Sequence, residues 1–281
     1  MTTTLRPTGP IQQGADGAKS HAYDVCDNGR PVGAVEIGTD PGFGEKAGVL
    51  RSLHIDESRR RRGRGTVAAL AAEEVLRGWG CTQVIAAIPA DDTAGHGLAT
   101  ALGYSERSRN MIKTLPQSSP ALPGGVAARP MTEDEFACWE RDAITSYAQT
   151  WIDRGVPVEQ AMRKAETSYG QNLPHGLATE GAHLHVLVHE DEVVGHVWVG
   201  RHEIHPGMLV GYVFDVEVRE EFRGRGYGRA LMLQAERIAL GAGDDRIGLH
   251  VLASNTPALR LYESLGYRTT QYNLAKTLQL L

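Results

Sequence analysis

The chain has 281 residues, of which 41% are hydrophobic, and its formal net charge at pH 7 is −5. This length and apolar content allow one large hydrophobic core or two ordinary ones, and the negative charge argues against general binding to nucleic acid or to an anionic membrane. The 3 cysteines lack the spacing of a metal site or a disulfide framework, so no metal is expected and a reducing compartment is the simplest environment. No apolar run of roughly 18 residues and no signal-peptide core are found, which predicts a cytoplasmic protein without membrane association.

The first half of the chain is predicted to begin with strands and to continue with helices. A strand is expected near residues 3–6, and a hairpin at residues 23–37 turns at Asn28-Gly29, a pair typical of tight hairpin turns. These strands leave no room for two early helices. An apolar, strand-like run then leads into residues 60–65, which open a helix-like run.

Residues 116–125 are rich in proline, serine and glycine and are predicted to form an interdomain linker. The second half should then form a strand, two helices and a hairpin around Asp191, at residues 126–129, 133–148, 157–172, and 183–189 with 193–199. The remainder should alternate strand, helix, strand, helix and strand, at residues 209–218, 228–240, 246–251, 256–265 and on to Leu278.

One motif occurs twice in the chain. Arg-x-x-Gly-x-Gly is found at residues 60–65 and at residues 223–228, so that Gly63 and Gly226 are separated by 163 positions. With this offset, about 19 of the 56 positions from 60 to 115 are identical in the second copy, far above chance for an ungapped pairing. The chain is therefore an internal duplication. We expect a first domain over residues 1–115, a linker at 116–125 and a second domain over 126–281.

The repeated motif is suited to binding a pyrophosphate. A glycine-rich turn between a strand and a helix leaves backbone N–H groups pointing outward, with the positive end of the helix dipole behind them. In both copies an apolar strand precedes the turn, and Leu-Gly-Tyr follows about 40 residues later, after an amphipathic helix. This combination is more specific than a lone glycine pair.

The second half resembles the GNAT superfamily of acyl-CoA-dependent N-acetyltransferases. The resemblance rests on Val216-Glu217-Val218, on the turn at residues 223–229, on Asn255 and on residues 261–267, and it extends to the first half from Tyr23 to Leu115. It implies an α/β fold of the α+β type with a mixed sheet in two tandem domains, the first lacking the two early helices. It also implies acetyl-CoA as co-substrate, with its pantetheine arm between two splayed central strands.

Carried over residue by residue, the resemblance implies that the glycine turn binds the pyrophosphate, that Asn255 contacts the pantetheine arm and that a backbone N–H near Val218 polarises the thioester carbonyl. The residues expected to bind the cofactor are then Val216, Val218, Arg223, Gly224, Arg225, Gly226, Tyr227, Gly228, Arg229 and Asn255.

Acyl transfer to an amine requires a neutral amine, whereas a free alkylamine has a pKa near 10.4. A base must therefore remove a proton, and an acid should protonate the departing thiolate. In the family this acid is typically the tyrosine of the Asn-x-x-Ala-x-x-Leu-Tyr stretch, which is Tyr262 here. The base is left open between Glu217, which shares a strand face with Asp215, and His250, with a chain of water molecules as a further alternative; we favour Glu217.

The first copy lacks these proton-transferring groups, because Ala87 and Ala99 stand at the positions of His250 and Tyr262. We therefore expect a degenerate, non-catalytic first domain. A second CoA site could remain there, although Asp92 replaces the amide of Asn255 and cannot donate its hydrogen bonds. Its residues would be Leu53, Ile55, Arg61, Arg62, Gly63, Arg64, Gly65 and Thr66.

The acceptor should be held by the two helices and the hairpin of the second half. Its notable side chains are Tyr147, Trp151, Tyr169, His175, His196 and Trp198, and Asp215 would suit a cationic amine. The expected activity is acetylation of a primary amine, of a small molecule, by direct attack in a monomer or homodimer. Alternatives are acetylation of a protein N-terminus or lysine, and a non-catalytic acyl-CoA-binding sensor or scaffold.

Overall fold

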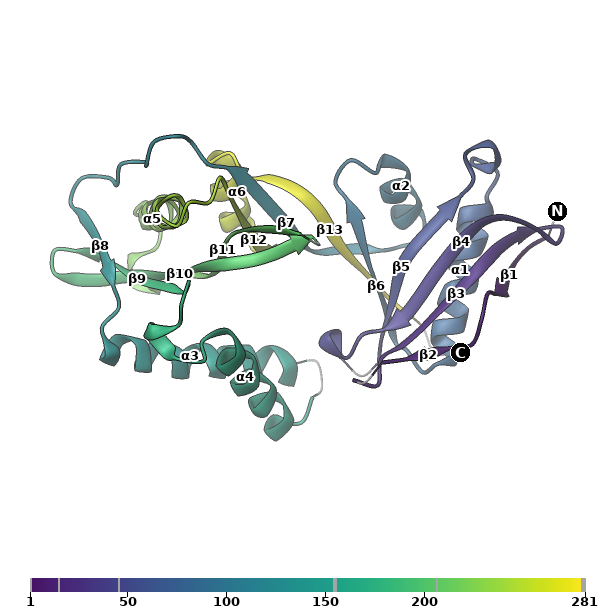
Figure 1. Ribbon diagram of the computed structural model, residues 1–281, viewed down its shortest axis with the longest axis horizontal. Coiled ribbons are helices and arrows are strands. Elements are labelled where there is room, and N and C mark those ends of the chain that lie inside the picture. The colour runs from purple at the N-terminus through teal and green to yellow at the C-terminus, as the bar shows by residue number, and fades with distance from the viewer. Residues whose placement is uncertain (1, 15, 45, 154–155, 206, 279–281) are drawn as a thin grey trace. The chain divides into compact units, whose positions relative to one another are not determined.

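The computed structural model describes residues 2–14, 16–44, 46–153, 156–205 and 207–278 (Figure 1). The chain divides into two compact units. Unit 1 comprises Met1–Arg109 and Thr270–Leu281, and unit 2 comprises Asn110–Thr269. Strands of both orientations and helices build each unit, so the expected α/β class with a mixed sheet is confirmed.

The strands of unit 1 lie in the order β1-β3-β4-β5-β6-β13, and β2 pairs with β3. Their bounds are β1 Thr3–Pro7, β2 Gln12–Gln13, β3 Lys19–Asp27, β4 Arg30–Thr39, β5 Ala47–Ile55, β6 Gln83–Pro89 and β13 Arg268–Thr277, with helices α1 Arg64–Gly78 and α2 Thr93–Ala101 and short turns η1 Pro41–Phe43 and η2 Glu57–Arg59. Between β1 and β3, the described residues contain no element other than β2. The expected loss of the two early helices is therefore confirmed.

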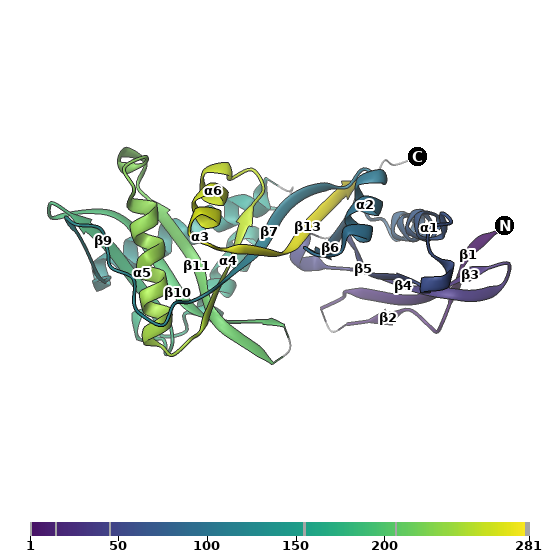
Figure 2. The same cartoon turned by 90° about the horizontal axis from the view of Figure 1, so that it is seen from above.

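In unit 2 the strand order is β7-β12-β11-β10-β9-β8. The bounds are β7 Ser105–Thr114, β8 Val126–Pro130, β9 His183–His189, β10 Glu192–His205, β11 Met208–Val218 and β12 Arg246–Leu252, with helices α3 Glu133–Ile152, α4 Val158–Asn172, α5 Tyr227–Gly241 and α6 Thr256–Ser264 and short turns η3 Gly176–Ala178 and η4 Glu220–Phe222. Helices α5 and α6 cover one face of these strands, and α3 and α4 cover the other (Figures 1 and 2).

Local sequence explains where these elements begin and turn. The hairpin of β3 and β4 turns at Asn28 and Gly29, whose φ angles of 49° and 80° are those that a tight hairpin requires. Helix α3 begins with a capping box: the Thr132 hydroxyl accepts from the Glu135 N–H at 3.3 Å, and the Glu135 carboxylate accepts from the Thr132 N–H at 2.8 Å. This cap fixes the start of the helix that forms one wall of the candidate site.

The closing strand of each repeat completes the other unit. In unit 1, β13 pairs antiparallel with β6, the Leu278 N–H donates to Thr82 O at 2.8 Å, and Lys276 Nζ donates to the Glu73 carboxylate at 2.6 Å. Unit 2 repeats these contacts with the 163-residue offset. Leu115 N–H donates to Asp245 O at 2.8 Å, and Lys113 Nζ donates to the Glu236 carboxylate at 2.6 Å.

The compact units therefore differ from the sequence division at residues 115 and 126. The sequence division assigned residues 126–281 to one domain, whereas backbone pairing with β6 places the last strand in unit 1, and the end of β7 belongs to unit 2. An ungapped repeat cannot reveal this exchange, because both copies of the strand carry the same Lys-Thr-Leu sequence and fit either partner.

We expect the exchange to be visible in paired stability variants. In Lys276→Met the Glu73 side chain, which is 4% exposed, loses its cation, and breaking such a pair costs about 3 kcal/mol. Hydrogen exchange should then show lost protection in β5, β6 and α1 of unit 1. The reciprocal variant Lys113→Met should instead loosen α5 and β12 of unit 2, because Glu236 is 1% exposed. Loss of protection in α5 on mutation of Lys276 would contradict the exchange.

Candidate active site

A β-bulge in the pairing of β10 with β11 lies at the point where β11 and its other neighbour, β12, stop pairing. Strand β10 pairs Trp198 with Asp215 but Val199 with Val213, so Phe214 is an extra residue on β11. Strands β11 and β12 pair in parallel only from Gly211 to Val213, whereas β11 continues to Val218. Because a bulge bends its strand and disrupts the local ladder, it explains why the pairing stops there. The result is a free edge on β11 from residue 214 to residue 218.

The backbone of this free edge presents hydrogen-bond donors. The Arg219 N–H donates to Val194 O on the β10 side at 3.0 Å. Successive N–H groups of an extended strand point to opposite sides, so the N–H of Val218 points to the free edge, as does that of Val216, which also interacts with the Asp215 carboxylate. A ligand lying between β11 and β12 would meet these donors.

The glycine turn lies at the end of the same strand. Gly224 and Gly226 have φ angles of 79° and 86°, which a side chain disfavours, and Gly226 caps the N-terminus of α5. Within the described chain, the backbone N–H groups of residues 224–228 have no backbone acceptor. The Arg223 Nε donates to Val218 O at 3.1 Å and so ties the turn to β11. This arrangement fits an anion at a helix N-terminus.

The side chains of the turn are mostly engaged with the protein itself. Tyr227 is 8% exposed, the Arg229 guanidinium donates to the Ser264 hydroxyl at 2.6 Å, and the Arg225 guanidinium lies 5.6 Å from the Phe222 ring centre. The backbone of the turn, rather than these side chains, is therefore the main anion-binding feature. A Cβ on Gly228 would lie 3.2 Å from the end of the Leu261 side chain on α6, so a larger residue there would have to displace that side chain.

Asn255 has a structural role in this arrangement. Its Oδ1 accepts from the Ala258 N–H at 3.2 Å and caps α6. Asp92 caps α2 of unit 1 in the same way, accepting from the Gly95 N–H at 2.8 Å. A cap needs only an acceptor oxygen, which explains why aspartate can replace asparagine in the first copy.

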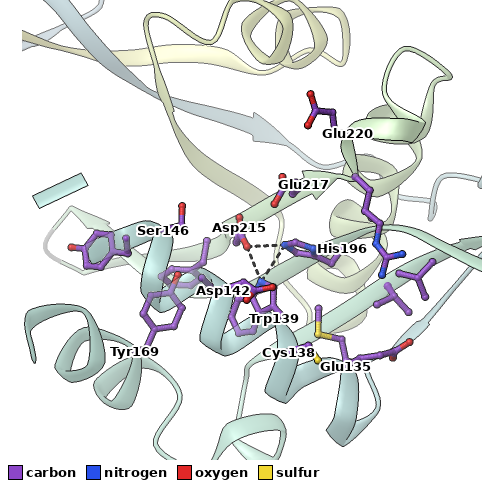
Figure 3. Close-up of a pocket in the computed structure, with 18 of the residues that line it drawn as sticks. Glu135, Cys138, Trp139, Asp142, Ser146, Tyr169, His196, Asp215, Glu217 and Glu220 are labelled. Carbon is purple, nitrogen blue, oxygen red and sulfur yellow. Dashed lines mark hydrogen bonds and ion pairs between the residues drawn. The ribbon is translucent and has the colours of Figure 1, made fainter. Parts of the chain in front are cut away.

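A cavity of about 890 Å³ lies between β10 and β11 and the two helices α3 and α4 (Figure 3). Its lining is rich in carboxylates and aromatic rings. The lining carboxylates are Asp134, Glu135, Asp142, Asp215, Glu217, Glu220 and Glu221, against the single cation Arg219, and the rings include Trp139, Tyr147, Tyr169 and Phe214. Phe214 and Asp215 both face this cavity although they are adjacent on β11, which is a consequence of the bulge.

Three side chains of the cavity wall meet in one hydrogen-bonded cluster. The Asp215 Oδ2 lies 2.9 Å from Trp139 Nε1 and 2.9 Å from His196 Nε2, and Figure 3 shows the three groups pointing toward one another. Burial alone would raise the pKa of Asp215, but the hydrogen bonds and charge of His196 and the hydrogen bond of Trp139 outweigh it, so the pKa lies below its ordinary value. Asp215 is therefore a carboxylate at neutral pH.

The catalytic candidates from the sequence lie in different surroundings. Glu217 lines the cavity, its side chain is 57% exposed, and it forms an ion pair with Arg223 at 3.3 Å. Tyr262 on α6 is 7% exposed, and burial, together with the charge of Asp215, raises its pKa to about 12. His250 is exposed on β12 and is not among the residues that line the cavity.

The acceptor candidates divide in the same way. Asp215 and Tyr147 line the cavity, whereas Trp151 and Trp198 are 3% and 6% exposed and pack in the hydrophobic core. Sequence reasoning did not single out Trp139 and assigned no proton-transfer role to His196. The register of β10 on β11 brings His196 to Asp215, and the packing of α3 on these strands brings Trp139 to both.

Unit 1 has a second cavity, of about 620 Å³, at its own glycine turn. It brings together Leu53, Ile55, Arg61, Gly63, Arg64, Gly65 and Thr66, while Arg62 lines a neighbouring cavity. Arg61 stands where unit 2 has Gly224 and has a φ of 61°, and Arg64, 3% exposed, forms an ion pair with Asp27. The turn keeps its shape, but the Arg64 side chain is held by the protein.

The splayed strands, the free β11 edge and the glycine turn at a helix N-terminus together define an acyl-CoA-dependent acyltransferase. The model of the Acetyltransferase (GNAT) family matches residues 5–104 and 135–267, and the chain belongs to this family.

Relatives match both one unit and the whole chain. A mycothiol acetyltransferase of Saccharomonospora viridis is 27% identical over 286 residues, covering 95% of this chain and 86% of that protein. An uncharacterized N-acetyltransferase of Bacillus subtilis, YycN, is 29% identical over 151 residues, covering 53% of this chain and 96% of its own. The tandem organisation is also found in a solved GNAT protein from the clavulanic acid biosynthesis pathway, with a TM-score of 0.52, 19% identity and coverage of 96% and 86%.

A GCN5-related N-acetyltransferase from Sphaerobacter thermophilus has the same fold, with a TM-score of 0.58 at 22% identity and coverage of 91% of this chain and 80% of that one. Among the described residues, no group of three or more histidine, cysteine or acidic side chains could hold a metal ion. No helix within the described ranges is long and apolar enough to cross a membrane.

We expect CoA binding to depend on the turn of unit 2. A valine at Gly226, where φ is 86°, would strain the turn by about 1–3 kcal/mol and displace its N–H groups. Gly226→Val should weaken CoA binding at least about tenfold by calorimetry. Gly243→Val is the matched control, because Gly243 has a φ of 84° beyond the other end of α5. Equal CoA affinity in the two folded variants would contradict this assignment.

Proposed function

We propose that unit 2 transfers the acetyl group of acetyl-CoA to a primary amine of a small, positively charged molecule by direct attack. The observation that carries this proposal is the carboxylate-rich cavity, which shares residues of β11 with the free strand edge. Its volume of about 890 Å³ lies within the range of small-molecule sites. The acceptor class is therefore argued from the charge and size of the cavity.

The cavity attracts cations in two ways. Seven carboxylates line the cavity against one lining arginine. Arginines outside the lining pair with three of them: Arg223 with Glu217, Arg141 with Asp142, and Arg129 with Glu135, whose pKa the hydrogen bonds of Arg129 lower to about 2. The aromatic walls, including Trp139 and Tyr169, add faces that attract ammonium groups. A neutral or anionic acceptor would lose both contributions.

We propose distinct roles for the residues around the thioester. When bound, acetyl-CoA supplies the acetyl group in activated form. The N–H groups of residues 224–228 would hold its pyrophosphate, with Arg223 fixing the turn, and the Val218 N–H would donate to the thioester carbonyl oxygen. Asn255 would position α6, and through it Tyr262.

Tyr262 is proposed as the acid for the sulfur. Its pKa of about 12 keeps the hydroxyl protonated throughout the neutral range. Complete transfer of the Tyr262 proton to the thiolate is unfavourable by itself, because the pKa of a thiol is ordinarily near 8.5, below that of Tyr262. The transfer becomes favourable when the new amide nitrogen returns its surplus proton to the tyrosine oxygen.

Unit 1 is proposed to be non-catalytic. Ala87 and Ala99 offer no proton at the positions of His250 and Tyr262, and the Arg64 side chain is bound to Asp27. Its contribution through β7, which completes unit 2, is structural. The cavity at residues 61–66 remains a candidate second CoA site.

A second candidate acceptor is a mycothiol-type amine. It is favoured by the end-to-end match with the mycothiol acetyltransferase of Saccharomonospora viridis, although 27% identity does not transfer a substrate. A thiol-release assay with acetyl-CoA and a panel of spermidine, 1,4-diaminobutane, glucosamine and a mycothiol-type amine separates the two. Turnover of none of these amines would contradict the proposed function.

We expect Tyr262→Phe to lower kcat by about 10²-fold or more, the usual effect of acid catalysis, without weakening CoA binding. Because the pKa of Tyr262 is about 12, the wild-type kcat should not fall through loss of this proton below about pH 10. Tyr212→Phe is the control, since burial also raises the pKa of Tyr212 to about 12 but its ring packs on His202. Unchanged kcat in Tyr262→Phe would eliminate this acid.

Removal of one carboxylate from the cavity should affect the Michaelis constant. Asp142→Asn should raise KM for a cationic amine about 3- to 10-fold with little change in kcat, because the lost attraction is on the order of 1 kcal/mol. The increase in KM should be smaller at about 0.5 M salt, because salt at roughly this ionic strength screens the attraction between the carboxylate and the amine. Glu166→Gln on the exposed face of α4 should leave KM unchanged, and equal KM values in both variants would argue against a cation site.

A further inference from the structure

The hydrogen-bonded cluster of Trp139, His196 and Asp215 has no proton-transfer role in the proposal above. It lies on the wall of the acceptor cavity, with His196 on β10, Asp215 on β11 and Trp139 on α3. The side chains of His196 and Asp215 are 18% and 34% exposed, so both remain accessible from the cavity. A buried structural pair would show no such access.

The distances determine how protons are arranged in the cluster. Trp139 Nε1 always carries a hydrogen, and it lies 3.1 Å from His196 Nε2 and 2.9 Å from Asp215 Oδ2. If it donated to the histidine, Nε2 would hold a lone pair 2.9 Å from a carboxylate oxygen, and two acceptors would face each other. Asp215 Oδ2 therefore accepts from both rings, and His196 carries its proton on Nε2.

This tautomer leaves a lone pair on the other ring nitrogen of His196. In a neutral imidazole one nitrogen donates and the other accepts, and here the carboxylate fixes Nε2 as the donor. Among the described residues no hydrogen bond to His196 Nδ1 is found. A carboxylate on one nitrogen and a free lone pair on the other is the arrangement of a histidine general base.

We propose that His196 is the general base for the acceptor amine and that Asp215 and Trp139 position it. The inference rests on the proposed function, in which an ammonium group enters this cavity. Nδ1 takes one proton from the ammonium, the freed nitrogen lone pair forms the bond to the carbonyl carbon, and the carbon–sulfur bond breaks. The sulfur takes the proton of Tyr262, the amide nitrogen returns its surplus proton to Tyr262, and His196 releases its proton to solvent.

The base candidates from the sequence are less well placed. Glu217 is engaged by Arg223 at 3.3 Å and more than half exposed, and a carboxylate is a weak base toward an ammonium. His250 is exposed on β12, away from the residues that line the cavity. His196 combines cavity access with a charged partner that stabilises the protonated ring.

The other titratable groups that line the cavity with His196 include side chains of β11, α3 and α4. Asp215 and Glu217 on β11 and Asp142 on α3 are carboxyl groups, and the pKa of Asp215 lies below its ordinary value. Tyr169 on α4 has a pKa raised to about 12, by burial and then by the charge of Asp215. Strand β9 presents Val186 opposite His196 and adds no charge there.

The test compares variants of the full chain with acetyl-CoA and the fastest amine among spermidine, 1,4-diaminobutane and glucosamine. His196→Gln should lower kcat about 10²- to 10⁴-fold and abolish the acid limb of the kcat/KM profile, while CoA affinity and thermal stability stay close to wild type. His196→Ala should be partly rescued by free imidazole, which a purely structural histidine would not be. Asp215→Asn should lower kcat about 10²-fold or more without rescue by imidazole.

Two controls distinguish the possible failures. His185→Gln, on β9 with its ring toward Gln234, should keep kcat and the acid limb. If His196→Gln keeps kcat within about threefold of wild type, or if Glu217→Gln removes the acid limb instead, the inference is overturned and the proposed function stands. If the wild type acetylates none of the amines, the proposed function fails and the inference fails with it.

Discussion

The β-bulge at Phe214 is the constraint on which the rest of unit 2 depends. It ends the pairing of β11 with β12 after Val213, and it turns Phe214 and Asp215 toward the same cavity. One extra residue thus creates both the gap that suits a pantetheine arm and the wall that holds the acceptor. Without the bulge, β11 would pair further along β12, and Asp215 would alternate to the other face.

The same device is present in unit 1, where it no longer has catalytic partners. Strand β4 pairs Glu36 with Ser52 but Ile37 with Leu50, so Arg51 is the extra residue, and the pairing of β5 with β6 ends at Leu50. The β5 positions Leu50, Arg51 and Ser52 lie 163 residues before Val213, Phe214 and Asp215 of β11. The backbone geometry was therefore kept in both copies. Unit 1 also depends on the closing strand of the second repeat, so the fold requires both copies even where only one is proposed to be catalytic.

The sequence predicted the elements that local patterns determine. The duplication, both hairpins, the missing early helices and the glycine turns follow from periodicity, turn residues and glycine spacing, and the structure contains them. It could not predict the strand exchange, since Lys113 and Lys276 fit either glutamate equally well. The sequence pattern also could not predict that His196 lies beside Asp215, because one bulge shifts the register by a residue and reverses which side chains share a face. The catalytic assignments, Tyr262 and Glu217 included, remain predictions.

A crystal structure of the full chain grown with CoA tests the central claim most directly. The account predicts pyrophosphate density at the N–H groups of residues 224–228 and a pantetheine arm along the free β11 edge, with its amides paired to the backbone of Val216 and Val218. The thiol of CoA should lie beside Tyr262 of α6. It should also lie next to β11, whose Asp215 lines the acceptor cavity. CoA bound at residues 61–66 but not at residues 224–228, or a pantetheine arm that avoids β11, would contradict the account.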